Sequence, residues 1–188
     1  MIAGSFFTPA QLLGYVALVL GVAAFLQKND TRLKALVAAE SVAYVVHFIL
    51  LGNYPASGSA GVSCLRNLTS IKTRAPVWIA VFLAVNVAIG VTFATGIAGW
   101  LPITASCLAT VAIFRMQGVA MRIVLLVCTL LWLVNNGLSG SIGGTVLESI
   151  IAIVNVTTIL RLTVERIRRK ETGTAAGPSL PEILPRST

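Results

Sequence analysis

The sequence predicts an all-α membrane protein with seven transmembrane helices, arranged as two parallel units of three helices joined by a single helix. Three observations predict this 3+1+3 architecture. The chain of 188 residues is 56% hydrophobic and only 11% charged, whereas soluble domains carry about 25% charged residues. Basic residues occur only in alternate connections between the apolar segments and at the adjoining helix ends. Finally, part of the sequence recurs 88 positions later, where Leu50, Gly52 and Asn67 return as Leu138, Gly140 and Asn155.

The repeated stretch extends beyond these identical residues. Further pairs at the same spacing agree in type, namely Tyr44 with Trp132, Asn53 with Ser141, Ser57 with Thr145 and Lys34 with Arg122. Each copy also carries the same order of apolar segments and basic loops. We therefore expect a first three-helix unit (residues 1–74), a linker helix (75–98), a second three-helix unit (99–163), and a basic and then disordered cytoplasmic tail (164–188).

The first unit contains three predicted spans. The first runs from about Thr8 to Leu26, with Gly14 and Gly21 on one face where another helix can approach closely. The second runs from about Leu33 to Leu51. The third, from about Ala56 to Ile71, is short and rich in small residues, so we expect it inside the bundle rather than against lipid.

The linker and the second unit supply four further spans. The linker helix runs from Val77 to about Thr95 and has no counterpart in the other copy. The fifth span is predicted from about Trp100 to Phe114, with Pro102 near its start, where proline is tolerated. The sixth runs from about Val119 to Asn136 and the seventh from about Ile142 to Leu162.

The distribution of charge predicts the orientation of the chain. The first, third and fifth connections and the segment after the seventh span are basic, whereas the second, fourth and sixth connections carry no basic residue. Basic loops stay in the cytoplasm. We therefore expect a multi-pass protein of the bacterial inner (plasma) membrane with its N-terminus outside and its C-terminus in the cytoplasm. The first 26 residues have no basic region before their apolar segment, which favours a retained span over a cleaved signal peptide.

Composition argues against several classes of function. A net charge of +8 would suggest nucleic acid in a soluble protein, but here the basic residues act as orientation signals and the expected partner is the lipid bilayer. The three cysteines have no Cys-x-x-Cys spacing and there is one histidine, so neither a metal site nor a cofactor is predicted. The only aspartate, Asp30, lies in a cytoplasmic loop far from His47. No Ser-His-Asp triad is possible there, and we do not expect an enzyme.

Ionisable residues inside a span cost about 2.5–3.5 kcal/mol each to insert, so each needs a partner or a function. Glu40 and Arg66 lie at a similar depth, roughly 10 Å from the cytoplasmic side at 1.5 Å per residue. We expect these two side chains to pair. The pair is either a fixed structural contact between two helices or a cytoplasmic gate that breaks and re-forms.

A second polar layer is predicted near the outer ends of the spans, formed by His47, Glu148, Asn135 and Asn136. A histidine and a carboxylate in a shared vestibule could take up and release a proton near neutral pH. The alternative is a hydrogen-bonded histidine at the level of the lipid headgroups.

Three short motifs resemble a known bacterial family: His47-Phe-x-Leu-Leu-Gly-x-Tyr-Pro-Ala56, Lys72-Thr-Arg74 and Gly140-Ser-Ile-Gly-Gly-Thr145. The chain resembles the YgjV-type bacterial inner-membrane proteins over nearly its whole length except the tail. That family has no established activity. More distantly, the 3+1+3 arrangement is similar to that of the SWEET sugar transporters and the wider PQ-loop (MtN3-like) superfamily, whose repeats are parallel. The Pro-Gln signature of that superfamily is absent from the first and fifth spans, so this chain either moves differently or does not transport.

The SWEET resemblance implies a substrate site. In SWEET proteins an asparagine on the third span and another on the seventh face each other across the cavity, and Asn67 and Asn155 match these positions. Both lie near the middle of a span, where an amide must find a partner or line a wet cavity. Hydrogen bonds that hold helices together are the alternative role. Tyr44 and Trp132, equivalent in the two copies, could sandwich a flat or sugar-like ligand or simply pack in the interior.

The leading hypothesis is a transporter of small polar solutes, such as a sugar or a vitamin precursor, that works by alternating access between the two units. The competing hypothesis is a non-transporting integral membrane receptor, assembly factor or partner protein. A cavity on the order of a few hundred Å³ between the units, typical of small-molecule sites, would favour transport. A bundle filled solid at the level of Asn67 and Asn155 would favour the competing hypothesis.

Overall fold

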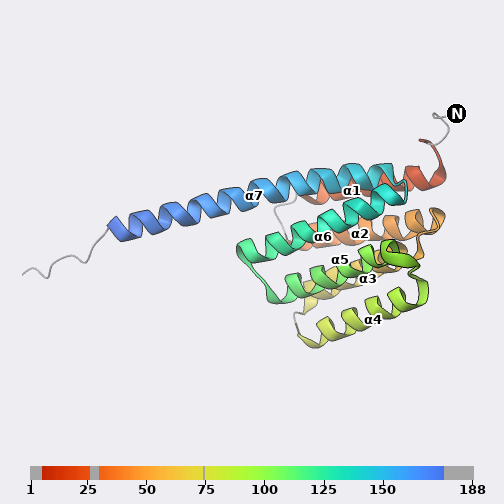
Figure 1. The fold of residues 1–188 in the computed structure, drawn as a ribbon, viewed down its shortest axis with the longest axis horizontal. Helices are drawn as coiled ribbons and strands as arrows, with labels where there is room; N and C mark the ends of the chain where they lie inside the picture. The colour runs from red at the N-terminus through yellow and green to blue at the C-terminus, as the bar shows by residue number, and fades with distance from the viewer. Residues whose placement is uncertain (1–5, 26–29, 74, 176–188) are drawn as a thin grey trace, which may run out of the picture.

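The computed structural model describes residues 6–25, 30–73 and 75–175, and these ranges contain seven α-helices (Figure 1). The all-α prediction is therefore confirmed. The helices are α1 (Pro9–Phe25), α2 (Asp30–Leu50), α3 (Tyr54–Lys72), α4 (Val77–Phe93), α5 (Gly96–Arg115), α6 (Gly118–Leu138) and α7 (Ile142–Ala175).

The structure corrects the start of the fifth helix. α5 begins at Gly96, earlier than the predicted start near Trp100, so Pro102 lies inside the helix rather than near its first turn. Gly96 has a φ of +64°, a conformation that residues with a side chain rarely adopt. This glycine forms the turn between α4 and α5, and the predicted linker segment 75–98 therefore ends inside α5.

The structure also corrects the end of the seventh helix. α7 continues to Ala175, well beyond the predicted end at Leu162, because the basic segment is rich in Arg, Glu and Lys, which favour helix. Arg161 and Glu165 add an i,i+4 ion pair of 3.0 Å. At 1.5 Å per residue the helix is about 51 Å long, and Figure 1 shows its C-terminal part projecting beyond the bundle. The disorder predicted after Lys170 is thus contradicted as far as Ala175, and residues 176–188 lie outside the described part of the chain.

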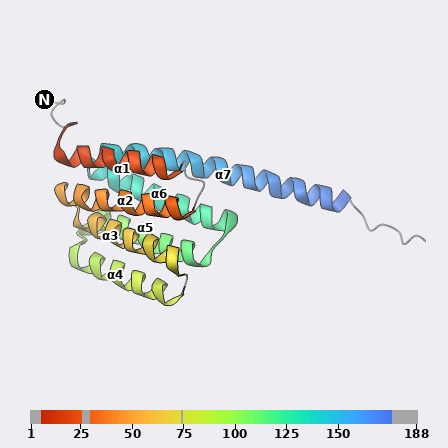
Figure 2. The ribbon, with the colours of Figure 1, turned by 180° about the vertical axis from the view of Figure 1, so that it is seen from behind.

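The helices form two facing rows. Within one row α1 packs on α2 and α2 on α3, and within the other α5 packs on α6 and α6 on α7. The rows meet where α1 packs on α7 and α3 on α5, and α4 packs on α3 and α5. In both ribbon views α7 lies along α1 while α4 lies at the opposite edge (Figures 1 and 2).

Glycines allow close contacts between helices, both within a row and between the rows. A Cβ atom added at Gly21 of α1 would lie 2.7 Å from Leu147 Cδ2 of α7, and one added at Gly14 would lie 2.9 Å from His47 Cε1 of α2. The prediction that these two glycines mark a close helix contact is confirmed. Alanines make up much of the buried core around them, which also permits close packing of helices.

The turn after α2 and the turn after α6 have the same geometry, 88 positions apart. Gly52 and Gly140 occupy the left-handed region at φ values of +70° and +67°. Asn53 N donates to Phe48 O and Ser141 N donates to Asn136 O, both at 2.9 Å. The side chains of Asn53 and Ser141 then accept from backbone N–H groups in the first turns of α3 and α7, at 3.1 and 3.2 Å. Each turn thus ends one helix and caps the next in the same way.

The outer surface of the bundle is strongly apolar. Large hydrophobic side chains are exposed all around it, among them Val19 at 66%, Val91 at 74%, Ile97 at 88% and Ile153 at 67% of their surface. Soluble monomers rarely expose contiguous apolar area on this scale. Three helices, Gly96–Arg115, Gly118–Leu138 and Ile142–Glu165, are long and apolar enough to cross a membrane by themselves, and two shorter helices, Pro9–Ala24 and Val77–Phe93, are also apolar.

Candidate functional site

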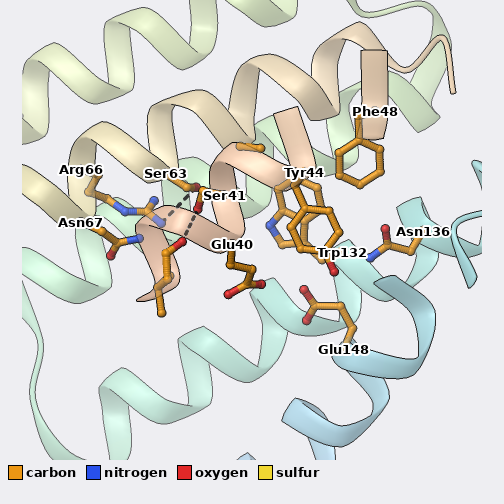
Figure 3. Close-up of a pocket in the computed structure, with 12 residues that line it drawn as sticks. Glu40, Ser41, Tyr44, Phe48, Ser63, Arg66, Asn67, Trp132, Asn136 and Glu148 are labelled. Carbon is orange, nitrogen blue, oxygen red and sulfur yellow. Dashed lines mark hydrogen bonds between the residues drawn. The ribbon is translucent and has the colours of Figure 1, made fainter. Parts of the chain in front are cut away.

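A cavity of about 130 Å³ lies between the two rows of helices, lined by residues of α2, α3, α6 and α7 (Figure 3). We call it the central cavity. Its charged and amide-bearing lining residues are Glu40, Arg66, Asn67, Asn136 and Glu148. The cavity therefore gathers polar side chains from both halves of the chain in the middle of an otherwise apolar bundle.

Arg66 projects from α3 toward α5. Its Nη1 atom donates to Ser106 O at 3.1 Å and to Thr110 Oγ1 at 3.2 Å. Its Nη2 atom donates to Ser63 Oγ at 3.2 Å, the contact that can be followed in Figure 3. Arg66 and Glu40 line the same cavity but do not form the expected ion pair, and the salt bridge found among the described residues is Arg161–Glu165. The polar face of α5 competes for the guanidinium, so the Glu40–Arg66 pair is not formed in this conformation. A gate that breaks and re-forms stays a prediction, because the pair is broken in one of its two states.

The two carboxyl groups of the cavity come from opposite halves of the chain. Glu40 lies on α2 and Glu148 on α7, and Figure 3 shows both side chains directed into the same space. They are close enough to interact electrostatically, and the Thr129 hydroxyl of α6 lies beside Glu148. The sequence placed Glu148 with His47 near the outer end, whereas the structure brings it together with Glu40.

Aromatic rings form another wall of the cavity. Phe48 stacks on Tyr44 with ring centroids 5.4 Å apart, and on Trp132 with centroids 5.8 Å apart. The three rings join α2 to α6. Tyr44 and Trp132 both line the cavity. Phe48 stacks against both of them, so the two rings do not form an empty slot for a flat ligand in this conformation.

Beyond this aromatic wall, hydrogen bonds between the two halves close the bundle at the end where α1 begins. We call these contacts the closing layer. His47 is fully buried, with Nδ1 2.6 Å from Ala10 O and Nε2 2.7 Å from Ser141 Oγ. A neutral ring that donates from Nδ1 and accepts at Nε2 satisfies both partners. His47 therefore bridges α1, α2 and α7.

Two further side chains complete the closing layer. Asn53 Nδ2 donates to Asn135 Oδ1 at 2.9 Å and to Ser139 Oγ at 2.6 Å. Gln11 Nε2 donates to Gly140 O at 2.6 Å, and Ile142 N donates to Gln11 Oε1 at 3.1 Å. All of these bonds join residues of α1–α3, or their turns, to residues of α6–α7.

Pockets lie on both sides of the central cavity. A pocket of about 340 Å³ on the outer side of the closing layer is lined by the turns that follow α2, α4 and α6, and Asn53, Asn135 and Ser139 are among its residues. A pocket of about 260 Å³ at the opposite end is lined by Lys34, Asn67 and Ser70 together with residues of α5 and α6. Asn67 lines both this inner pocket and the central cavity.

Comparison with known proteins identifies the family. The model of the Imp-YgjV family, described as "Bacterial inner membrane protein", matches residues 8–166. The chain is also 33% identical over 152 residues to "Inner membrane protein YgjV" of Escherichia coli (strain K12), which covers 81% of this chain and 83% of the relative. The chain belongs to the YgjV family of bacterial inner membrane proteins. No solved structure matches it.

Membership of the YgjV family confirms the resemblance predicted from the sequence motifs and accounts for the apolar outer surface. The matched range contains all of α1 to α6 and most of α7. The family name is that of an inner membrane protein, and it assigns no activity to the polar interior.

The structure places the ten predicted site residues of this YgjV-family protein in three different surroundings. Seven of them line the central cavity: Tyr44, Asn67, Trp132, Glu40, Arg66, Asn136 and Glu148. His47 and Asn135 lie in the closing layer instead. Asn155 is buried in α7 but does not line the cavity, and α7 packs on α1 and α6 rather than on α3, so Asn67 and Asn155 are not brought face to face.

Sequence reasoning missed Gln11, Asn53, Ser139 and Ser141, which make most of the closing layer. Asn53 and Ser141 carried a signal, because they are equivalent in the repeat and follow the glycines that end α2 and α6. Gln11 carried no such signal. Within the described residues no group of three or more His, Cys, Asp or Glu side chains could hold a metal ion.

Proposed function

We propose that this YgjV-family protein is a transporter of small polar solutes that works by alternating access between two three-helix units. The observation that supports the proposal is that the outer pocket, the central cavity and the inner pocket follow one another along the bundle. The outer pocket is the one beside Asn53 and Ser139, and the inner pocket is the one beside Lys34 and Ser70. The closing layer separates the outer pocket from the central cavity, whereas the central cavity and the inner pocket share Asn67. The central cavity also shares Asn136 with a pocket of about 300 Å³ that is lined by Gly140, Ser141 and Ile142. The pockets thus extend from the central cavity toward both ends of the bundle, as a path for a solute would require.

The division into units is supported by the helix bounds. α2 spans Asp30–Leu50 and α6 spans Gly118–Leu138, which coincide after a shift of 88 positions, as do the starts of α3 at Tyr54 and α7 at Ile142. The packing pattern is also unchanged when α1, α2 and α3 are exchanged with α5, α6 and α7. The α1–α7 contact becomes the α5–α3 contact, and the pairs within one unit become the pairs within the other.

The proposed units cross the membrane seven times, with α4 as the linker. α2 and α3 are the least apolar of the spans because they carry Glu40, Arg66 and many small residues. Their polar side chains face the cavity or other helices, which is how polar groups are accommodated at membrane depth. With seven spans, every basic connection lies at one end of the bundle and every uncharged turn at the other.

The closing layer would be the outer gate. Apart from the contact of His47 Nδ1 with Ala10 O, which lies within the first unit, its hydrogen bonds are made between the units. A small rotation of one unit against the other would break these bonds together. At about 130 Å³ the central cavity is smaller than the roughly 300–1,000 Å³ of ordinary small-molecule sites. This size favours a compact solute.

A reversible cross-link across the closing layer tests the proposal. Asn53 Nδ2 and Ser139 Oγ lie 2.6 Å apart, so cysteines at these positions in a background without Cys64, Cys107 and Cys128 should react with a short, reducible thiol cross-linker. Purified protein is placed in liposomes loaded with a bacterial metabolite extract, and the retained metabolites are measured by mass spectrometry. At least one polar solute should leave faster than from protein-free liposomes, and cross-linking should stop its efflux until reductant is added.

The variants Asn53→Cys and Ser139→Cys, each treated with the same cross-linker, are the matched controls and should keep their efflux. If no solute responds to the intact protein or to cross-linking, the transport proposal fails. The alternative of a receptor, assembly factor or partner protein would then stand, because such a protein needs no moving gate.

A further inference from the structure

The central cavity holds more negative than positive charge. Glu40 and Glu148 both line it, and Arg66 is the one basic residue in its lining. The guanidinium group of Arg66 is held by Ser106, Thr110 and Ser63 and pairs with neither carboxyl group. With all three groups ionised, the cavity lacks one unit of positive charge.

Charge inside a bundle must be balanced, because an unpaired ion away from water is costly. Two carboxylates that face each other repel, and a cation placed between them would stabilise both. The carboxyl groups come from α2 and α7, which belong to different halves of the chain. A cation bound by both would therefore also join the two halves.

The Tyr44 hydroxyl is a second, independent indication of a ligand. Tyr44 is 8% exposed, lines the cavity and has a buried hydroxyl oxygen without a hydrogen-bond partner among the described residues. Figure 3 shows this hydroxyl directed toward Glu148. A buried hydroxyl is normally paired, and here a bound group that donates a hydrogen bond would supply the partner.

The aromatic wall decides which kind of cation fits. Ca²⁺ takes six or more oxygen ligands and Mg²⁺ needs an octahedral shell of oxygen atoms. One side of this cavity consists of the rings of Tyr44, Phe48 and Trp132, which offer a metal ion few oxygen ligands. Aromatic faces attract ammonium groups through cation–π interactions. An organic ammonium ion can donate hydrogen bonds to carboxylates on one side and rest its carbon atoms on the rings on the other.

We propose that the central cavity binds one small organic ammonium ion, with the carboxylates of Glu40 and Glu148 as its counter-ions and the Tyr44 hydroxyl as a further acceptor. Binding itself does not depend on transport. The further statement that such an amine is the transported solute rests on the proposed function. The cavity volume of about 130 Å³ limits the ligand to a few heavy atoms, which bounds its dissociation constant to the order of 1 mM.

Titration of the purified protein in nanodiscs with ethylammonium chloride tests the site. Trp132 lies in the cavity wall, so binding should change the tryptophan fluorescence and raise the melting temperature. Ethanol, which has the same shape without the charge, and sodium chloride at equal ionic strength should have no saturable effect. Glu40→Gln and Glu148→Gln should each weaken ethylammonium binding at least tenfold.

Glu165→Gln is the matched control. It also removes one carboxylate, but from an exposed position on α7 beside Arg161, and should bind ethylammonium as the wild type does. Tyr44→Phe removes only the hydroxyl oxygen and should weaken binding severalfold, which keeps the test informative if a glutamine variant does not fold. Equal binding by all variants, or an equal response to sodium or to pH alone, would overturn the proposal.

The two proposals can fail separately. Saturable ethylammonium binding without any flux in liposomes would retain the cation site and refute transport. Flux that responds to the closing-layer cross-link while ethylammonium neither binds nor competes would retain transport and refute the cation site.

Discussion

At the scale of single residues, the contact between α7 and α1 depends on the absence of a side chain at Gly143. A Cβ atom built there would overlap the carbonyl oxygen of Gly14, lie 2.6 Å from its carbonyl carbon and 3.1 Å from Tyr15 N. These are backbone atoms, which cannot rotate away as the end of a side chain can. α1 and α7 therefore touch backbone to backbone next to the closing layer.

We predict that Gly143→Ala destabilises the protein by about 1–3 kcal/mol, the usual range for overpacking. Gly137→Ala is the matched control, because Gly137 is also helical and a Cβ atom there would meet nothing within 4 Å. That change should be neutral or stabilise by up to about 1 kcal/mol, since alanine favours helix over glycine. Unfolding in mixed detergent micelles, followed by tryptophan fluorescence, measures both. Equal effects would show that the α1–α7 contact has room to spare.

At the scale of helices, the polar turn after α6 both closes the bundle and starts α7. Ser141 Oγ accepts from Gly144 N at 3.2 Å and lies 2.7 Å from His47 Nε2. One hydroxyl group thus caps α7 and satisfies a buried histidine of α2. The equivalent residue Asn53 caps α3 and reaches α6 in the same manner. The residues that cap α3 and α7 therefore also bind other helices, Asn53 through Asn135 of α6 and Ser141 through His47 of α2.

Ser141→Ala should lower the free energy of unfolding by about 1–3 kcal/mol, because it removes a cap and leaves a buried ring nitrogen without a partner. Ser149→Ala provides the comparison. Ser149 lies on the same helix and its hydroxyl donates to the i−4 carbonyl of Thr145 at 2.8 Å, a bond that contributes little to helix stability. Its loss should change stability by less than about 0.5 kcal/mol. Thermal unfolding of both variants in detergent measures the difference, and a Ser141→Ala protein as stable as Ser149→Ala would contradict it.

The helices also show how far sequence reasoning reached. The number and order of the helices followed from apolar runs and turn residues, and depth along a helix followed from its rise per residue. Glu40 and Arg66 were thus placed at the right level, and both line the same cavity. Rotation about the helix axis was not readable, because apolar residues surround these helices. The sequence therefore did not reveal that Arg66 faces Ser106 and Thr110 of α5 rather than Glu40.

Asn155 shows the same limit at the other end of the chain. Its spacing of seven from Glu148 places both residues on one face of α7, yet only Glu148 lines the central cavity. The missing information was which helix that face meets at each level. It is set by the packing of α7 along α1 and α6, a tertiary arrangement that no periodicity within α7 determines.

At the scale of the whole molecule, the two halves run in the same direction. Figure 1 shows the start of α1 and the end of α7 at opposite ends of the bundle, as an odd number of helices that alternate in direction requires. The basic connections after α1, α3 and α5 then lie at the end where α7 leaves the bundle. Parallel units related in this way would present one shared outer face and one shared inner face to the two sides of a membrane.

This arrangement predicts the topology of every connection. Alkaline phosphatase, which is active only outside the inner membrane, should be active when fused after Asn53, Thr95 or Ser139. Green fluorescent protein, which becomes fluorescent in the cytoplasm, should be fluorescent when fused after Arg74, Gln117 or Thr188. Each reporter placed at the other set of sites is the control and should be silent. Basic residues flank only the second set, and they are retained in the cytoplasm.

Two results would contradict this topology. One is an active phosphatase fusion at Thr188, and the other is silent phosphatase fusions at Asn53 and Ser139. The closing layer could not then be an outer gate, because its residues would face the cytoplasm.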